Sequence, residues 1–217
     1  GTGGKAGGPN YLVGFGSWKP EDLDSSSALT EPRLVRLIQA AAPILDEEQL
    51  ARLNVAASSD QAAWRTLFGV AHDPSALTAE INAFRYRPTA VTVRVESDDP
   101  IAVLREASAA VVTGSPAMFS FREEPAEDLA GVLTELGLTV RVEDDTTFDR
   151  DIRGRVRHLG DRDLLTAVGG SIDVSVHSSP TLYPGRLALL PYLHEQAVSV
   201  TNHRFGHPTP LTDDLRI

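Results

Sequence analysis

The stretch from Thr89 to Phe121 reads TAVTVRVESDDPIAVLREASAAVVTGSPAMFSF, and its pattern decides the fold class. Its first part alternates valine with polar residues over 91–95, which predicts a strand. The next apolar residues recur at helical spacing and stop before Gly114, and Ala117 begins a second strand-like run. A strand, a helix and a strand in this order predict a right-handed βαβ unit with parallel strands.

The alternation of strands and helices continues towards the C-terminus. Further strands are expected at 138–142, 156–159 and 172–176, and further helices at 125–136, 148–152 and 161–168. We expect Asp161 to cap the last of these helices, and Gly169 and Gly170 to end it. A final strand is expected at 197–201. Residues 89–217 are therefore predicted to form an α/β domain with a Rossmann-like, open and mainly parallel sheet.

The residues before this domain predict a linker and a small helical module over 16–88. Thr30 offers an N-cap for a first helix, with a proline in its first turn. Asp46 begins a second helix with a capping-box pattern. Ser59 is expected to open a third helix, which Gly69 ends.

Composition and charge exclude several classes of function. The chain has 217 residues, no cysteine and a formal charge of −10 at pH 7. The absence of cysteine excludes disulfides, thiolate zinc sites and a cysteine nucleophile. The acidic balance disfavours nucleic acid, because phosphate binding relies on clustered Lys and Arg. The segment 84–88, FRYRP, could stack on bases, but its acidic surroundings favour a role in packing and ion pairing.

No apolar run approaches the roughly 20 residues of a membrane span. The chain begins with Gly1 rather than Met, and we therefore expect it to be a piece of a longer protein.

A glycine-rich stretch opens the chain, where residues 1–11 read GTGGKAGGPNY. Five of the first eight residues are glycines, so few Cβ atoms keep a ligand away from the backbone. Such a segment can turn its N–H groups inward as an anion cradle. It lacks the residue order of a P-loop, and a flexible terminus is the alternative reading.

The expected sheet lacks the loop that a dinucleotide needs. A phosphate-binding site requires a glycine turn after the first strand, but ESDDP follows Val95. The adjacent carboxylates of Asp98 and Asp99 would repel a pyrophosphate, so no cofactor site is predicted in this chain. His203 and His207 stand four apart without an HExxH motif, and no metal site is predicted there. The residues show no catalytic machinery.

Three segments resemble proline utilization A. Residues 1–12, GTGGKAGGPNYL, are similar to the family's GTGPKAGGPxYL segment near the end of its glutamate-semialdehyde dehydrogenase module. Residues 82–88, NAFRYRP, resemble the family's NxFRYRP segment. Residues 190–206, LPYLHEQAVSVTNHRFG, resemble the LLPFLREQAVSITxHRFG ending of the actinobacterial type. The three segments occur in the family's order.

The resemblance implies a bifunctional parent polypeptide. Its FAD-dependent proline dehydrogenase makes pyrroline-5-carboxylate, which hydrolyses to glutamate semialdehyde, and its NAD-dependent dehydrogenase oxidises that aldehyde to glutamate. Residues 1–15 would end the dehydrogenase module, where the backbone N–H groups of Gly7 and Gly8 would anchor the substrate carboxylate. The family has Pro in place of Gly4, a change expected to loosen the loop without removing its donors.

The resemblance also implies a role for residues 89–217. They would be a degenerate aldehyde-dehydrogenase-superfamily domain, a non-catalytic lid and scaffold over the passage between the two active sites. The expected partners are the upstream modules of the same polypeptide and, in a homo-oligomer, other copies. The expected location is the cytoplasm or the inner face of the membrane. Two alternatives stay open, an NAD-binding domain and a self-association module.

Overall fold

The computed structural model describes residues 8–11, 15–17, 28–77, 80–201, 203–204 and 207–208. Its main body is built on a five-stranded sheet with the order β4-β3-β2-β5-β6, in which all neighbouring strands are parallel. The strands are β2 (Val91–Val95), β3 (Ala117–Phe121), β4 (Thr139–Val142), β5 (Gly154–Leu159) and β6 (Val174–His177). The predicted α/β class and the open parallel sheet are confirmed.

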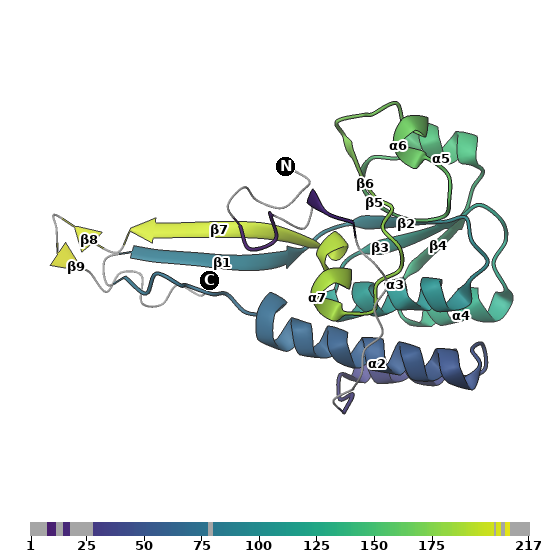
Figure 1. Cartoon of the computed structure of the whole chain (residues 1–217), viewed down its shortest axis with the longest axis horizontal. Helices are drawn as coiled ribbons and strands as arrows, with labels where there is room; N and C mark the ends of the chain where they lie inside the picture. Colours follow the sequence, from purple (N-terminus) through teal and green to yellow (C-terminus); the bar gives the residue numbers. More distant parts are fainter. Residues whose placement is uncertain are drawn as a thin grey trace.

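Helices cover both faces of this sheet (Figure 1). α3 and α4 lie on one face with α2 as a further layer outside them, and α5 and α6 lie on the other face. The helical elements are α1 (Pro32–Ala41), α2 (Glu47–Ala63), the π-helical turn η2 (Trp64–Phe68), α3 (Pro100–Thr113), α4 (Glu127–Glu135), α5 (Asp145–Asp151), α6 (Leu164–Ala167), α7 (Gly185–Ala188) and the 3-10 turn η3 (Leu190–Tyr192). None of these described helices combines the length and apolar character that crossing a membrane requires.

α3 is the central helix of the body, and every residue from Ile101 to Thr113 is buried. The side chain of Asp99 caps it by accepting a hydrogen bond from the backbone N–H of Ile101. Gly114 ends it with a φ of +69°, a left-handed conformation that favours glycine. Because the helix is enclosed, its polar residues must find their partners inside the protein.

β1 (Glu80–Pro88) and β7 (Leu193–Thr201) form a separate antiparallel pair, which we call the ribbon. The ribbon projects from the body, and the short strands β8 (His203–Arg204) and β9 (His207–Pro208) lie beyond its tip (Figure 1). Its register places Tyr86 opposite Glu195. The strand expected at 197–201 therefore forms, but it pairs with β1 and lies outside the parallel sheet.

The helix signals before the sheet were confirmed in part. Asp46 and Gln49 form the expected capping box at the start of α2. Thr30 is not the cap of α1, because Glu31 occupies that position. The side-chain oxygen of Gln61 accepts hydrogen bonds from the backbone N–H groups of Thr30 and Glu31 instead.

Two expected helix starts were wrong. Ser59 does not open a helix, because α2 continues through it to Ala63 and the turn η2 follows. Here tertiary contacts override the local preference of serine and aspartate, since the neighbouring Asp60 is bound inside the core by Arg105. Asp163, and not Asp161, caps α6 by accepting from the N–H of Thr166.

Candidate substrate-anchor site

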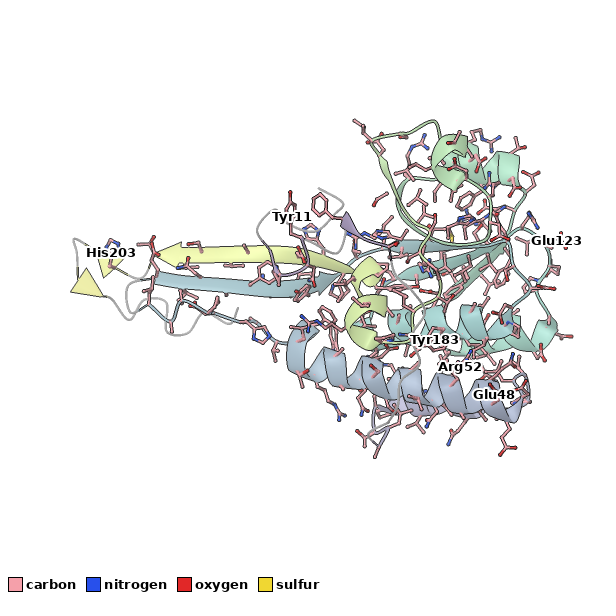
Figure 2. All side chains as sticks on the ribbon, viewed as in Figure 1. Tyr11, Glu48, Arg52, Glu123, Tyr183 and His203 are labelled. Atoms are coloured by element: carbon pink, nitrogen blue, oxygen red, sulfur yellow. The ribbon has the colours of Figure 1, made fainter. Side chains whose placement is uncertain are left out.

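The part of the glycine-rich stretch that the structure describes, Gly8–Tyr11, forms a turn. The backbone N–H of Tyr11 donates to the carbonyl of Gly8 at 3.1 Å. Figure 2 shows Tyr11 beside the ribbon, where its ring meets that of Phe15 edge-on at 5.1 Å. Gly8, predicted as an anchor residue, is half-buried in this turn, whereas Gly7 lies outside the described residues.

Asn10 fastens this turn to the base of the ribbon. Its side-chain amide donates to the hydroxyl of Tyr86 at 2.8 Å and to Oε1 of Glu195 at 2.8 Å. Both acceptors are buried, with 5% of Tyr86 and 7% of Glu195 exposed. Since Tyr86 belongs to β1 and Glu195 to β7, a single side chain contacts both strands of the ribbon.

Aromatic contacts hold the ring of Tyr86 from the body and from the ribbon itself. Its ring lies edge-on to Phe68, at 4.7 Å between centroids, and to Phe84, at 5.4 Å. Burial raises the pKa of Tyr86 above its ordinary value, and the charge of Glu195 adds to this, while Asn10 and Arg186 act in the opposite direction. The phenol therefore stays neutral at pH 7 and can accept from Asn10.

Buried arginines donate hydrogen bonds to backbone carbonyls in the connection from β6 to β7. Arg105 donates to the carbonyl of Leu182 at 2.9 Å, and Arg157 donates to that of Ser179 at 2.7 Å. Arg155 donates to the carbonyls of Pro191, at 3.0 Å, and of Leu193. These bonds fix the backbone that leads into β7, and with it the direction in which the ribbon projects.

Buried carboxylates compensate two of these arginines. Asp60 makes a two-pronged contact with Arg105, at 2.7 Å to each terminal nitrogen, and also accepts from Ser108 at 2.7 Å. Glu106 accepts from Arg157 at 2.9 Å and from the hydroxyl of Tyr192 at 2.8 Å. Burial raises the pKa of Asp60, and the charge of Arg105 opposes that rise.

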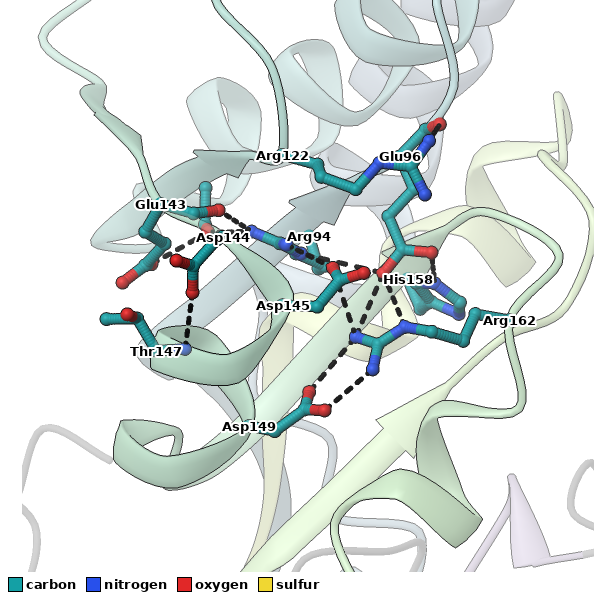
Figure 3. Close-up of polar contacts among 11 residues, drawn as sticks. Arg94, Glu96, Arg122, Glu143, Asp144, Asp145, Thr147, Asp149, His158 and Arg162 are labelled. Atoms are coloured by element: carbon teal, nitrogen blue, oxygen red, sulfur yellow. Dashed lines mark hydrogen bonds and ion pairs between the residues drawn. The ribbon is translucent and has the colours of Figure 1, made fainter.

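The carboxyl ends of β2 and β5 mark the topological switch point, where open α/β sheets usually bind ligands. This place is occupied by side chains of the protein itself (Figure 3). Oε1 of Glu96 lies 3.0 Å from Arg162, and Oε2 lies 3.2 Å from Nε2 of His158. The His158 contact has an ion-pair distance but not the angle of a hydrogen bond. The Glu96 side chain is only 3% exposed.

The same network extends to α5 (Figure 3). Arg94 is fully buried and donates to Asp145 at 2.6 Å and to the hydroxyl of Ser120 at 2.9 Å. Arg162 donates to both oxygens of Asp149, at 2.7 and 3.0 Å. These contacts raise the pKa of Arg162, mainly through Asp149, so its guanidinium is charged at neutral pH.

A cavity of about 670 Å³ lies next to this network, at the carboxyl ends of β2 and β3. Its lining contains one arginine, Arg122, and five carboxylate side chains: Glu96, Asp98, Glu123, Glu124 and Asp128. Figure 2 shows Glu123 at the end of the body that is remote from the ribbon. The acidic loop after β2 thus lies against this cavity, through Glu96 and Asp98.

The histidines noted in the sequence lie in the short strands β8 and β9. His203 is in β8 opposite Pro208, and His207 is in β9 opposite Arg204. Within the described ranges, no three His, Asp or Glu side chains are arranged to hold a metal ion.

Sequence reasoning missed Asn10, Tyr86 and Glu195 as members of the site. Asn10 and Glu195 are 185 residues apart in the chain, so no local pattern could have joined them. The one available signal was that all three lie in segments that resemble proline utilization A.

Two solved structures are similar to large parts of the chain. The chain is similar to proline utilization A from Corynebacterium freiburgense, with 32% identity over 95% of its length and a TM-score of 0.68. Proline utilization A from Bradyrhizobium japonicum, as the D779Y mutant, aligns over 66% of the chain with 21% identity and a TM-score of 0.50. The chain spans only 18% and 19% of the lengths of these two proteins.

A weaker likeness, with a TM-score of 0.46 and 12% identity, is to a NAD-dependent benzaldehyde dehydrogenase from Corynebacterium glutamicum. No protein-family model and no curated protein matches the chain. The chain is therefore a domain similar to proline utilization A, with an open parallel α/β sheet.

Proposed function

We propose that this chain is the C-terminal part of a bifunctional proline-catabolic enzyme of the actinobacterial type. In this proposal Gly7 and Gly8 anchor the carboxylate of glutamate semialdehyde through their backbone N–H groups. Residues 89–217, together with the ribbon, form a non-catalytic lid and scaffold that helps to enclose the passage between the two active sites. The observation that carries the proposal is the contact of Asn10 with Tyr86 and Glu195, which joins the anchor turn to the ribbon.

The shape of the ribbon supports a covering role. Two nine-residue strands project from the body and reach the anchor turn at their base (Figure 1). An antiparallel pair of this length is marginal on its own in water. The buried side chains of Arg105, Arg155 and Arg157 bind the backbone that leads into the ribbon. This attachment gives the ribbon the defined position that a lid needs.

The switch point supports a role without a nucleotide. Glu96 and Arg162 fill the position where a cofactor phosphate would approach the sheet, and the neighbouring cavity is lined by carboxylates. We therefore assign NAD and FAD to the upstream modules of the parent. Residues 1–15 belong in this assignment to the dehydrogenase module, 16–88 to a linker and helical module, and 89–217 to the lid.

The partners follow from this assignment. The upstream catalytic modules are the primary partner, and a second copy of the protein is the alternative if the ribbon associates with another subunit. We place the parent in the cytoplasm or at the inner face of the membrane. Light scattering of the full-length enzyme at several concentrations separates a monomer from a self-associating protein.

The lid function is tested by a substitution on the ribbon in the full-length enzyme. Val198→Asp places a charge on a half-buried position of β7, opposite Ala83. Thr201→Asp adds the same charge at an exposed position of the same strand and is the matched control. We expect Val198→Asp alone to let the aldehyde intermediate escape to an external trapping reagent. Equal retention of the intermediate by both variants, with normal expression, would contradict the lid function.

A further inference from the structure

We propose that Asn10 is a positioning residue for recognition of the substrate carboxylate, because it ties the anchor turn to a fixed surface of the ribbon. This inference rests on the proposed function, since it assumes that the turn at Gly8 binds a carboxylate. The proposed anchor itself consists of backbone N–H groups. Asn10 adds a side chain, which contacts the ribbon at Tyr86 and Glu195.

The geometry uses both hydrogens of one amide. One N–H of Asn10 points to the Tyr86 hydroxyl and the other to Glu195 Oε1, each at 2.8 Å. The two acceptors face each other across the ribbon in its antiparallel register. The contact therefore restrains the turn in two directions, which a single hydrogen bond would not do.

Glu195 explains why an amide is required at this position. A buried carboxylate needs donors, and a hydrogen bond to a charged group is stronger than one between neutral groups. With the amide turned the other way, its oxygen would face the Glu195 carboxylate, so the assigned orientation is the one that attracts. An aspartate at position 10 would bring a second negative charge to Glu195, and a leucine would leave the carboxylate without this donor.

The surface that receives the amide is well fixed. The Tyr86 ring is held by Phe68 and Phe84, and the backbone entering β7 is bound by Arg155 at Pro191 and Leu193. Asn10 itself lies inside the turn closed by the hydrogen bond from Tyr11 to Gly8. A restraint on Asn10 therefore acts two residues from Gly8, whose N–H is the proposed anchor donor.

A preorganised anchor affects only substrates that use it. Loss of the Asn10 contacts should raise KM for the carboxylate-bearing aldehyde, because the donors must then be ordered during binding. It should leave turnover of an aldehyde that has no carboxylate unchanged. This split between substrates distinguishes positioning from a general loss of structure.

The experiment measures the aldehyde dehydrogenase reaction of the full-length enzyme with glutamate semialdehyde and with propanal. Asn10→Leu is expected to raise KM for glutamate semialdehyde by about tenfold or more, as expected for two lost hydrogen bonds, and to leave propanal unaffected. Tyr86→Phe keeps the ring and removes one acceptor, so a smaller rise is expected. Asn54→Leu, on α2, is the control for an asparagine substitution elsewhere.

The Gly8→Pro variant, which lacks the backbone donor, separates two kinds of failure. If Gly8→Pro raises KM for glutamate semialdehyde and Asn10→Leu does not, the role of Asn10 is wrong and the proposed anchor stands. If neither variant raises it, the anchor itself is wrong, and the role of Asn10 falls with it. If Asn10→Leu impairs both aldehydes equally, Asn10 is only structural and the inference is overturned.

Discussion

The carboxylate of Glu96 lies 3.2 Å from the imidazole of His158, between the carboxyl ends of the two strands that flank the topological switch point. In an open α/β sheet this is the place where a ligand normally meets the strand ends. Here two side chains from β5 and the loop after β2 meet, and Arg162 lies 3.0 Å from the same Glu96 carboxylate. The switch point of the open parallel sheet is thus occupied by side chains of the protein itself.

We expect the 217-residue chain not to bind NAD. Isothermal calorimetry of the 217-residue chain with NAD should give no saturable heat, because Glu96 and the carboxylates of the cavity repel the pyrophosphate. Saturable binding would favour the alternative of a functional NAD-binding domain.

The Glu96 side chain packs against Gly160, where a larger residue should destabilise the fold. A Cβ atom at Gly160 would lie 2.8 Å from the Glu96 side chain and 2.9 Å from Nε2 of His158. Gly160→Ala should therefore lower the free energy of unfolding by about 1–3 kcal/mol, the usual cost of overpacking. Gly131→Ala, inside α4 with nothing within 4 Å, should raise it by about 0.5–1 kcal/mol. Urea unfolding of both variants measures the contrast, and equal effects would show that the network can move aside.

The buried ion pair of Asp60 and Arg105 joins α2 to α3. Asp60→Ala removes the carboxylate and leaves the Arg105 guanidinium buried, so unfolding should become easier by about 3–5 kcal/mol. The double variant Asp60→Leu/Arg105→Leu removes both charges and should lose much less. If the double variant is as unstable as Asp60→Ala, the hydrogen bonds of Arg105 to Leu182 and Tyr183 are the larger contribution.

We expect His177 to make the free energy of unfolding depend on pH. Burial, together with the charges of Arg155 and Arg157, lowers the pKa of His177 from 6.5 to about 4. The unfolded chain therefore binds a proton that the folded chain does not, and the contribution of His177 to stability falls from pH 6.5 towards pH 4. His177→Leu should reduce this acid sensitivity by about 1–3 kcal/mol in urea unfolding measured across that window. Parallel pH profiles for both proteins would exclude the effect.

The parallel sheet could be predicted because its signals are local. Valine alternation over Val91–Val95 and the glycine stop at Gly114 each act within one element. β1 was not predicted: the alternation of Phe84 and Tyr86 with arginines was interpreted as a packing and ion-pair cluster, and the partner strand begins only at Leu193. A two-stranded pair of distant segments leaves almost no local signal.

The site was predicted only where the chain resembles a known family. Gly8 followed from that resemblance, but Asn10 has an ordinary turn composition around it. Its importance comes from Tyr86 and Glu195, which the fold brings to it from distant positions. In the same way Asp60 has the appearance of a surface residue in the sequence, and only the burial of Arg105 on α3 explains it.

Transient kinetics of the full-length enzyme test most directly the proposal that this chain helps to enclose a passage between two active sites. NADH formation is followed after mixing with proline, an electron acceptor and NAD, for the native enzyme and for Val198→Asp. We expect no lag for the native enzyme and a clear lag for Val198→Asp, with the two separate half-reactions unchanged. The absence of a lag in Val198→Asp, with both half-reactions intact, would contradict the account.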